Sequence, residues 1–75
     1  MNGETELTPR LQCDVELEFV GPSVPVLEKW AADMLRALAD RVERGEFDDG
    51  FTDVKDESGK LVGKIYVDYT EGECG

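Results

Sequence analysis

The feature that most constrains this chain is residues 24–44, whose apolar side chains are spaced as on an amphipathic helix. Steps of three and four residues place them along one side of a 3.6-residue turn. Pro25 suits the first helical position, Ser23 offers a polar cap slightly earlier, and Gly45 suits the left-handed residue that ends a helix. A helix of roughly 20 residues, about 30 Å long, must lay this stripe on another layer, which we expect to be a sheet. The stripe consists of Leu27, Trp30, Ala31, Met34, Leu35, Leu38 and Val42, and we expect Trp30 in the core.

Three other segments have the patterns of strands. Residues 11–19 alternate strictly between apolar and polar, which predicts a strand with one buried face and places Cys13 in the core. Residues 51–55 and 60–69 form two further candidate strands. Between them, Asp56-Glu57-Ser58-Gly59 has the composition of a type I turn followed by a left-handed glycine, which predicts a hairpin with a bulge.

The order strand, helix, strand, strand predicts an α+β fold, a single βαββ domain with one helix on a three-stranded sheet. If the last strand pairs with the first, the sheet is antiparallel with order 1-3-2, and its other face is solvated. The alternative places the second strand parallel to the first through a right-handed crossover. We expect an N-terminal arm at 1–10, the domain at 11–70 and a tail at 71–75, with Phe47 under the helix end. The helix should cover Cys13, Val15, Leu17, Ile65 and Val67, while Val62, Lys64, Tyr66 and Asp68 face outward.

The charge of the chain is strongly acidic and unevenly placed. Eighteen acidic and eight basic residues give a net charge of -10. Residues 21–44 carry four of each sign, so the excess lies in the flanking segments. A field of this sign repels nucleic acid and membrane surfaces and attracts basic protein surfaces. Since the sequence has neither a membrane-spanning run nor a secretory signal, we expect a cytoplasmic protein.

The chemistry-bearing residues do not form a catalytic or metal-binding pattern. The two cysteines, Cys13 and Cys74, indicate a reduced compartment rather than a disulfide framework, and no histidine is present to complete a zinc site or activate a serine. Neither Asp48 nor Asp49 starts a calcium-loop register. Carboxylates on solvated faces lack the pocket that acid–base catalysis requires. We therefore expect no enzyme, no cofactor and no metal.

The candidate partner-binding residues are two groups of acids and one aromatic. Asp14, Glu16 and Glu18 recur along one strand face at roughly 6.6 to 6.8 Å, which imitates the phosphate charge of DNA only in part. Their alternative role is to keep an edge strand soluble and unpaired. Tyr66 is either an exposed anchor for a partner or a packing partner of Val62 or Phe51. The whole set is Asp14, Glu16, Glu18, Glu46, Asp48, Asp49, Asp53, Asp56, Glu57 and Tyr66.

Half of the chain bears a resemblance to phage proteins. The run Leu-Arg-Ala-Leu-Ala-Asp-Arg-Val-Glu-Arg-Gly-Glu-Phe-Asp-Asp-Gly at 35–50, with the Asp-Val-Lys-Asp-Glu-Ser-Gly-Lys-Leu-Val-Gly-Lys hairpin at 53–64, resembles small uncharacterised proteins of bacteriophages and prophages. The chain is also similar in length, acidity and compactness to anti-CRISPR proteins, many of which occlude a nucleic-acid-binding surface of a bacterial defence complex. That class shares no sequence pattern, so the resemblance assigns no functional residue.

Three hypotheses about function follow. The first is an inhibitor in the bacterial cytoplasm that binds a basic surface of a nucleoprotein complex through the acidic residues and does not bind nucleic acid directly. The second is a structural or oligomeric accessory protein, for example a homodimer joined by an apolar contact around Val62 and Tyr66. The third is a module that responds to a small ligand or a metal.

Overall fold

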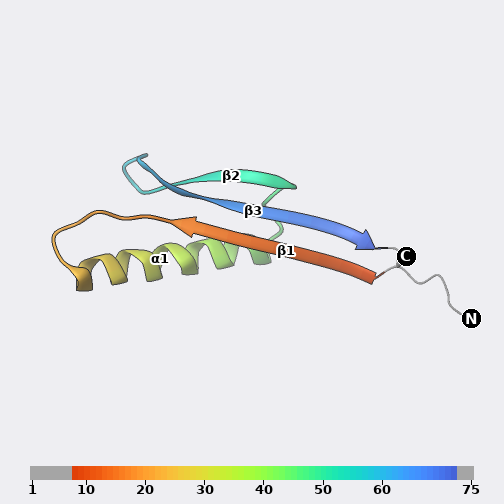
Figure 1. Cartoon of the computed structure of the whole chain (residues 1–75), viewed down its shortest axis with the longest axis horizontal. Helices are drawn as coiled ribbons and strands as arrows, with labels where there is room; N and C mark the ends of the chain where they lie inside the picture. Colours follow the sequence, from red (N-terminus) through yellow and green to blue (C-terminus); the bar gives the residue numbers. More distant parts are fainter. Residues whose placement is uncertain (1–7, 73–75) are drawn as a thin grey trace, which may run out of the picture.

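The structure, a computed structural model that describes residues 8–72, has one helix and one antiparallel sheet (Figure 1). The elements are β1 (Thr8–Leu17), α1 (Val24–Glu43), β2 (Gly50–Lys55) and β3 (Leu61–Gly72), and the strand order is β1-β3-β2. The α+β fold and the 1-3-2 order are confirmed, and the alternative with β2 parallel to β1 is wrong. Residues 8–10 and 71–72 belong to strands rather than to the expected arm and tail. The rest of that arm, the rest of that tail and Cys74 lie outside the described residues.

The ends of α1 follow from local hydrogen bonding. Ser23 is the N-cap, and its hydroxyl accepts from the N–H of Val26 at 3.4 Å, so the helix begins at the earlier of the two expected positions. At the other end Gly45 has a φ of 70°, and its N–H donates to the carbonyl oxygen of Val42. The expected helix of about 20 residues is confirmed.

The β2–β3 hairpin turns at Asp56, whose carboxylate accepts from the N–H groups of Ser58 and Lys60. Gly59 takes the left-handed conformation, with a φ of 90°, as expected. Val54 pairs with Gly63 and Lys55 with Leu61, so Val62 is an extra residue in β3. This bulge turns Val62 into the core, where it is buried, and the expectation that it faces outward is wrong.

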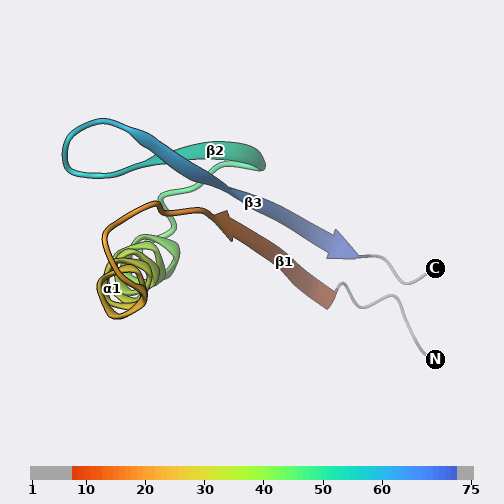
Figure 2. The same ribbon diagram turned by 60° about the vertical axis from the view of Figure 1, so that its left-hand side comes forward.

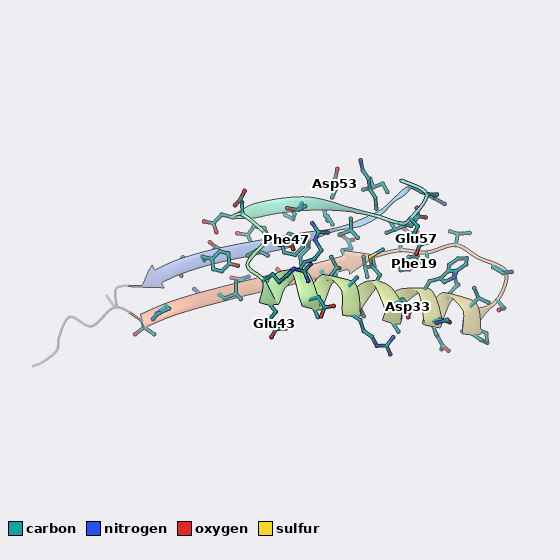
Figure 3. The ribbon with its side chains drawn as sticks, turned by 180° about the vertical axis from the view of Figure 1, so that it is seen from behind. Phe19, Asp33, Glu43, Phe47, Asp53 and Glu57 are labelled. Atoms are coloured by element: carbon teal, nitrogen blue, oxygen red, sulfur yellow. The ribbon has the colours of Figure 1, made fainter. Side chains whose placement is uncertain are left out.

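The core lies where α1, β2 and β3 overlap. Phe47 is buried beneath the helix end, as expected, and the Arg41 guanidinium lies 4.6 Å from its ring centroid (Figure 3). Leu17, Phe19, Met34 and Val42 pack against this core while remaining partly exposed. The buried hydrophobic residues are Leu38, Phe47, Val54, Val62, Ile65 and Val67.

Beyond this core, β1 and β3 continue as a two-stranded extension past the C-terminal end of α1 (Figures 1 and 2). We call residues 8–13 of β1 with residues 67–72 of β3 the projecting ribbon. β2 pairs only as far as Val67, so it does not accompany the ribbon. The radius of gyration is 16.6 Å, whereas a compact chain of 75 residues would have about 11 Å. The molecule is therefore elongated.

Because α1 ends before it reaches the ribbon, the inner face of the sheet is covered only in part. Cys13 is exposed and Val15 is 40% exposed, so the expectation that the helix buries them is wrong. Leu11 and Tyr69, which pair across the same face, are exposed as well. Trp30 is also not in the core: it is 41% exposed and packs at a tilt against Phe19, with ring centroids 6.5 Å apart.

Candidate functional site

The sheet face turned away from α1 brings together residues from all three strands, and we call it the outer sheet face. Directly paired residues in a sheet point to the same side. Asp14 pairs with Tyr66, and Tyr66 pairs with Phe51. The next row joins Glu16, Lys64 and Asp53. Figure 3 shows Asp53 pointing away from the helix.

An exposed aromatic pair lies at the centre of this face. The ring centroids of Phe51 and Tyr66 are 4.8 Å apart at an interplanar angle of 46°. Phe51 is 67% exposed, while Tyr66 is half-buried. Of the two expected packing partners of Tyr66, the structure places Phe51 against it and Val62 in the core. A shallow groove of about 260 Å³ runs beside the rings, with Asp14 and Glu16 in its lining.

The charge around the aromatic pair is mainly negative. Asp14, Glu16 and Asp53 are exposed on this face, and Asp68, half-buried, pairs with Gln12 one row further along. Within these rows the cation is Lys64. Its Nζ lies 3.8 Å from Glu16 Oε1 and 5.1 Å from the centroid of the Phe51 ring. An exposed pair at that distance leaves most of the negative field in place.

Two of the expected partner-binding acids, Glu46 and Asp56, form hydrogen bonds within the chain. Glu46 accepts from Arg41 at 3.1 Å and from Arg44 at 2.7 Å, which ties the loop to the end of α1. These hydrogen bonds, first that from Arg44 and then that from Arg41, hold the pKa of Glu46 below its usual value. Hydrogen bonds from the Ser58 side chain and the Lys60 backbone likewise lower the pKa of Asp56.

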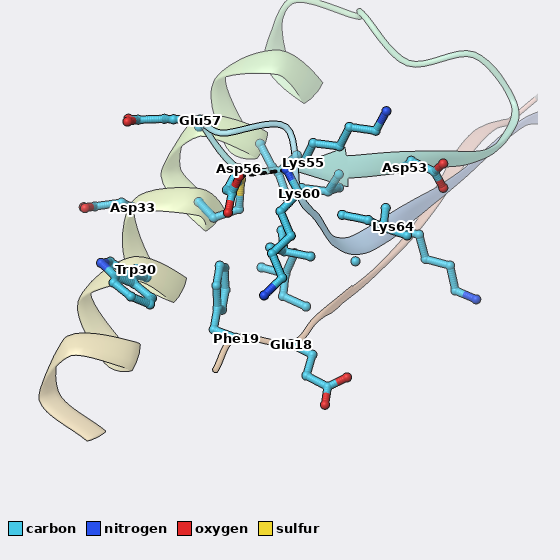
Figure 4. Close-up of a pocket in the computed structure, with 18 of the residues that line it drawn as sticks. Glu18, Phe19, Trp30, Asp33, Asp53, Lys55, Asp56, Glu57, Lys60 and Lys64 are labelled. Carbon is cyan, nitrogen blue, oxygen red and sulfur yellow. Dashed lines mark hydrogen bonds between the residues drawn. The ribbon is translucent and has the colours of Figure 1, made fainter. Parts of the chain in front are cut away.

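The remaining expected acids lie outside the two paired rows described above. Asp49 accepts from the N–H of Tyr69 at 3.0 Å and so fastens the loop before β2 to β3. Asp48 is exposed in that same loop. Glu18 and Glu57 line a groove beside α1 (Figure 4), whose lining also includes Glu16, Asp53 and Lys64. The structure thus gathers Asp14, Glu16, Asp53 and Tyr66, and places the other six elsewhere.

The groove beside α1 is larger and lies between the first half of the helix, the hairpin and the end of β1. Its volume is about 1370 Å³, and its lining includes the apolar side chains of Phe19, Trp30 and Met34. Charges of both signs surround it, among them Glu18, Asp33, Lys55 and Lys60. The groove was not expected from the sequence, because Trp30, which lines it, was assigned to the core. The charges on the outer sheet face, in contrast, are mainly negative.

Residues 8–72 were compared with the requirements of a metal cluster and of a membrane-crossing helix. The described side chains include no group of three His, Cys, Asp or Glu residues placed to hold a metal ion. Within the same range, α1 lacks the run of apolar residues that a membrane-crossing helix needs.

No protein-family model, curated protein or solved structure matches the chain.

Phe51 was expected only as a possible packing partner of Tyr66, and it is absent from the set of predicted binding residues. Its strand is short and weakly patterned, so the sequence did not show that Phe51 pairs with Tyr66. The alternation of Phe51 with Thr52 and Asp53 would have placed it on the same face as Asp53, but only the pairing register places it beside an aromatic.

Proposed function

We propose that this protein is a non-enzymatic binding protein whose outer sheet face binds a basic surface of another protein. The observation that carries this proposal is the arrangement of the face: an exposed aromatic pair, Phe51 and Tyr66, surrounded by carboxylates from three strands. It is a flat surface with a shallow groove rather than an enclosed pocket, which suits a macromolecular partner better than a small substrate.

Arginine and lysine side chains fit this arrangement in two ways. Their cationic groups bind over aromatic faces, as Lys64 already does at Phe51, and they pair with carboxylates such as Asp14 and Asp53. Aromatic residues are also enriched among those that contribute most to binding at protein interfaces. The carboxylates accelerate encounter with a basic partner, and the rings supply the contact area.

In its narrower form the proposal is that the partner is a bacterial nucleic-acid-binding complex, and that this protein inhibits it by occluding the basic surface. The net charge of -10 and the resemblance to phage and anti-CRISPR proteins support this form. Occlusion fits better than detailed imitation of DNA, because the strand spacing of roughly 6.6 to 6.8 Å matches only every second phosphate.

The experiment that tests the proposal is titration with a synthetic arginine-rich peptide as a probe of a basic surface. We expect binding that weakens steeply as salt is raised. In Asp14→Lys/Glu16→Lys, association should slow by about tenfold because the field around the rings reverses. Phe51→Ala should mainly speed dissociation.

The matched control is Glu28→Lys/Glu43→Lys on α1, which makes the same change in net charge at exposed helix positions. If this control slows association as much as the β1 variant does, total charge governs binding and the outer sheet face is not the site. Binding that is unaffected by salt would also contradict the proposal.

The narrower form is tested by competition. A partner captured from a bacterial lysate should bind nucleic acid by itself, and this protein should displace that nucleic acid in proportion to its occupancy. A captured partner that holds nucleic acid and this protein at the same time would contradict occlusion and leave the broader proposal standing.

A further inference from the structure

The outer edge of β1 is a long, regular strand edge without a neighbour in the described part of the chain. β1 pairs with β3 in an unbroken register, from Thr8 with Gly72 to Leu17 with Gly63. The opposite edge of the sheet is β2, which has six residues and a shift in register after Val54. A long regular edge is a template for another strand, whereas a short, irregular edge is not.

The alternation of the backbone shows which groups β1 offers at that edge. The N–H of Glu18 donates to the carbonyl oxygen of Val62 in β3. In an antiparallel pair such bonds recur at every second residue, so even-numbered positions of β1 direct their backbone groups to β3. The N–H and C=O groups of Leu11, Cys13 and Val15 therefore point to the open side.

We propose that a second copy of this chain pairs along this edge, β1 antiparallel to β1, about a twofold axis at Cys13. In this register Leu11 lies opposite the partner's Val15, and Cys13 lies opposite the partner's Cys13. On the outer face Arg10 lies opposite the partner's Glu16, and Gln12 opposite the partner's Asp14. Because the contact is isologous, each of these complementary pairs occurs twice.

Charge disfavours one neighbouring register, and the number of ladder hydrogen bonds disfavours the other. An axis at Asp14 would place Asp14 opposite the partner's Asp14, and like charges directly opposite each other destabilise a sheet. An axis at Gln12 would leave the outward N–H of Leu17 without a partner residue in the described strand, whereas an axis at Cys13 places Leu17 opposite the partner's Pro9, whose carbonyl can accept it. Arg10 lies opposite an acid in all three registers, but that acid is Glu16 only when the axis lies at Cys13.

The same register also joins the parts of the inner face that α1 leaves uncovered in the two copies. The twofold axis runs through the sheet, so both copies keep α1 on the same side of one six-stranded sheet. Antiparallel pairing lays the projecting ribbon of one copy beside the half of the partner that α1 covers. The exposed side chains of Leu11, Cys13 and Val15 then join the same three residues of the partner in one continuous apolar strip.

The first test measures mass by sedimentation equilibrium at about 10–100 µM protein. We expect a dimer of the 8.3 kDa chain. Arg10→Glu and Glu16→Arg should each raise the dissociation constant about tenfold, because each places like charges opposite each other twice. The double variant Arg10→Glu/Glu16→Arg, which restores the net charge and both pairs, should recover most of the loss. A monomeric wild-type chain, or a double variant as weak as the sum of its parts, would overturn the proposal.

The second test fixes the register with the oxidant diamide, which accepts the two electrons and two protons released when two thiols form a disulfide. In the Cys74→Ser chain, Cys13 should cross-link rapidly, because paired residues in a ladder have Cα atoms about 5.5 Å apart, within the range of a disulfide. The control Gln12→Cys/Cys13→Ser/Cys74→Ser should cross-link much more slowly. Equal rates in the two chains, or a faster rate in the control, would overturn the register centred on Cys13.

Discussion

The central strand β3 and the open-edge strand β1 have the same alternating pattern but very different burial. Val15 and Ile65 show the contrast most directly, because they are cross-strand partners on the inner face. Ile65 in the central strand is completely buried, whereas Val15 at the open edge is 40% exposed. The difference teaches that alternation determines which way a side chain points, while the reach of α1 and β2 determines whether anything covers it.

The largest expected effect separates these two partners. Ile65→Ala should cost about 2–5 kcal/mol of unfolding free energy because it opens a cavity in the core. Val15→Ala should cost less than about 1 kcal/mol in the monomer because its methyl groups are already partly solvated. Urea denaturation of both variants at low protein concentration measures the difference. Equal costs would mean that the inner face is covered as well at the β1 edge as at the central strand, and would break the comparison.

Gly63 of β3 lies opposite Leu17 of β1, where the backbones of the two strands approach closely. A Cβ at this residue would collide with the backbone carbonyl of Glu16, and backbone does not move aside as a flexible side chain does. We expect Gly63→Ala to cost about 1–3 kcal/mol and to loosen the pairing of β1 with β3. Hydrogen exchange of the β1 amides measures that loosening. Gly59→Ala, at the hairpin turn, is the control: it should leave β1 protection unchanged.

Weakening the helix cap should affect the covered end alone. Ser23→Ala removes the hydroxyl that accepts from Val26 and should cost about 1 kcal/mol. Ser23→Asp retains a good cap and serves as the control. Thermal unfolding gives the cost, and hydrogen exchange shows where it falls. A change in ribbon amides that leaves those of α1 untouched would contradict this assignment.

The smallest expected effect is a dependence on pH at the hairpin turn. The folded state lowers the pKa of Asp56, so the ionised carboxylate stabilises the folded state. This stabilisation is complete above the pKa of the unfolded state and is lost as pH falls through the pKa of the folded state. Below about pH 4 the amide signals of Ser58 and Lys60 should shift as the carboxylate accepts a proton. NMR titration follows this change, and Asp56→Ala should abolish it. An unchanged acid step in Asp56→Ala would assign the effect to another group.

Much of the fold could be predicted from local signals. Ser23 and Gly45 marked the ends of α1, and the Asp56–Gly59 turn marked the hairpin. The strand order was one of two alternatives, and it depended on the condition that the last strand pairs with the first. What the sequence lacked was the position of the helix along the sheet, which depends on how the connecting loops lie. Cys13, Val15 and Trp30 were therefore misplaced even though the element containing each was identified.

The candidate site was predictable to a smaller extent. Alternation along β1 placed Asp14 and Glu16 on one face, and the structure agrees. Glu46 and Asp56 belong to the same acidic segment, yet each has short-range hydrogen-bonding partners that composition does not reveal. The role of Phe51 depends on pairing between strands, a non-local property that no single segment encodes.

Gly63 limits how β1 can shift along β3, and so how far β1 overhangs the rest of the molecule. If β1 slid by two residues toward the N-terminal end of β3, Leu17 would lie opposite Leu61. A residue with a side chain would then take the place of Gly63 beside the carbonyl of Glu16. Gly63 therefore helps to hold β1 in its register, because the carbonyl of Glu16 comes too close to β3 for any residue that carries a Cβ.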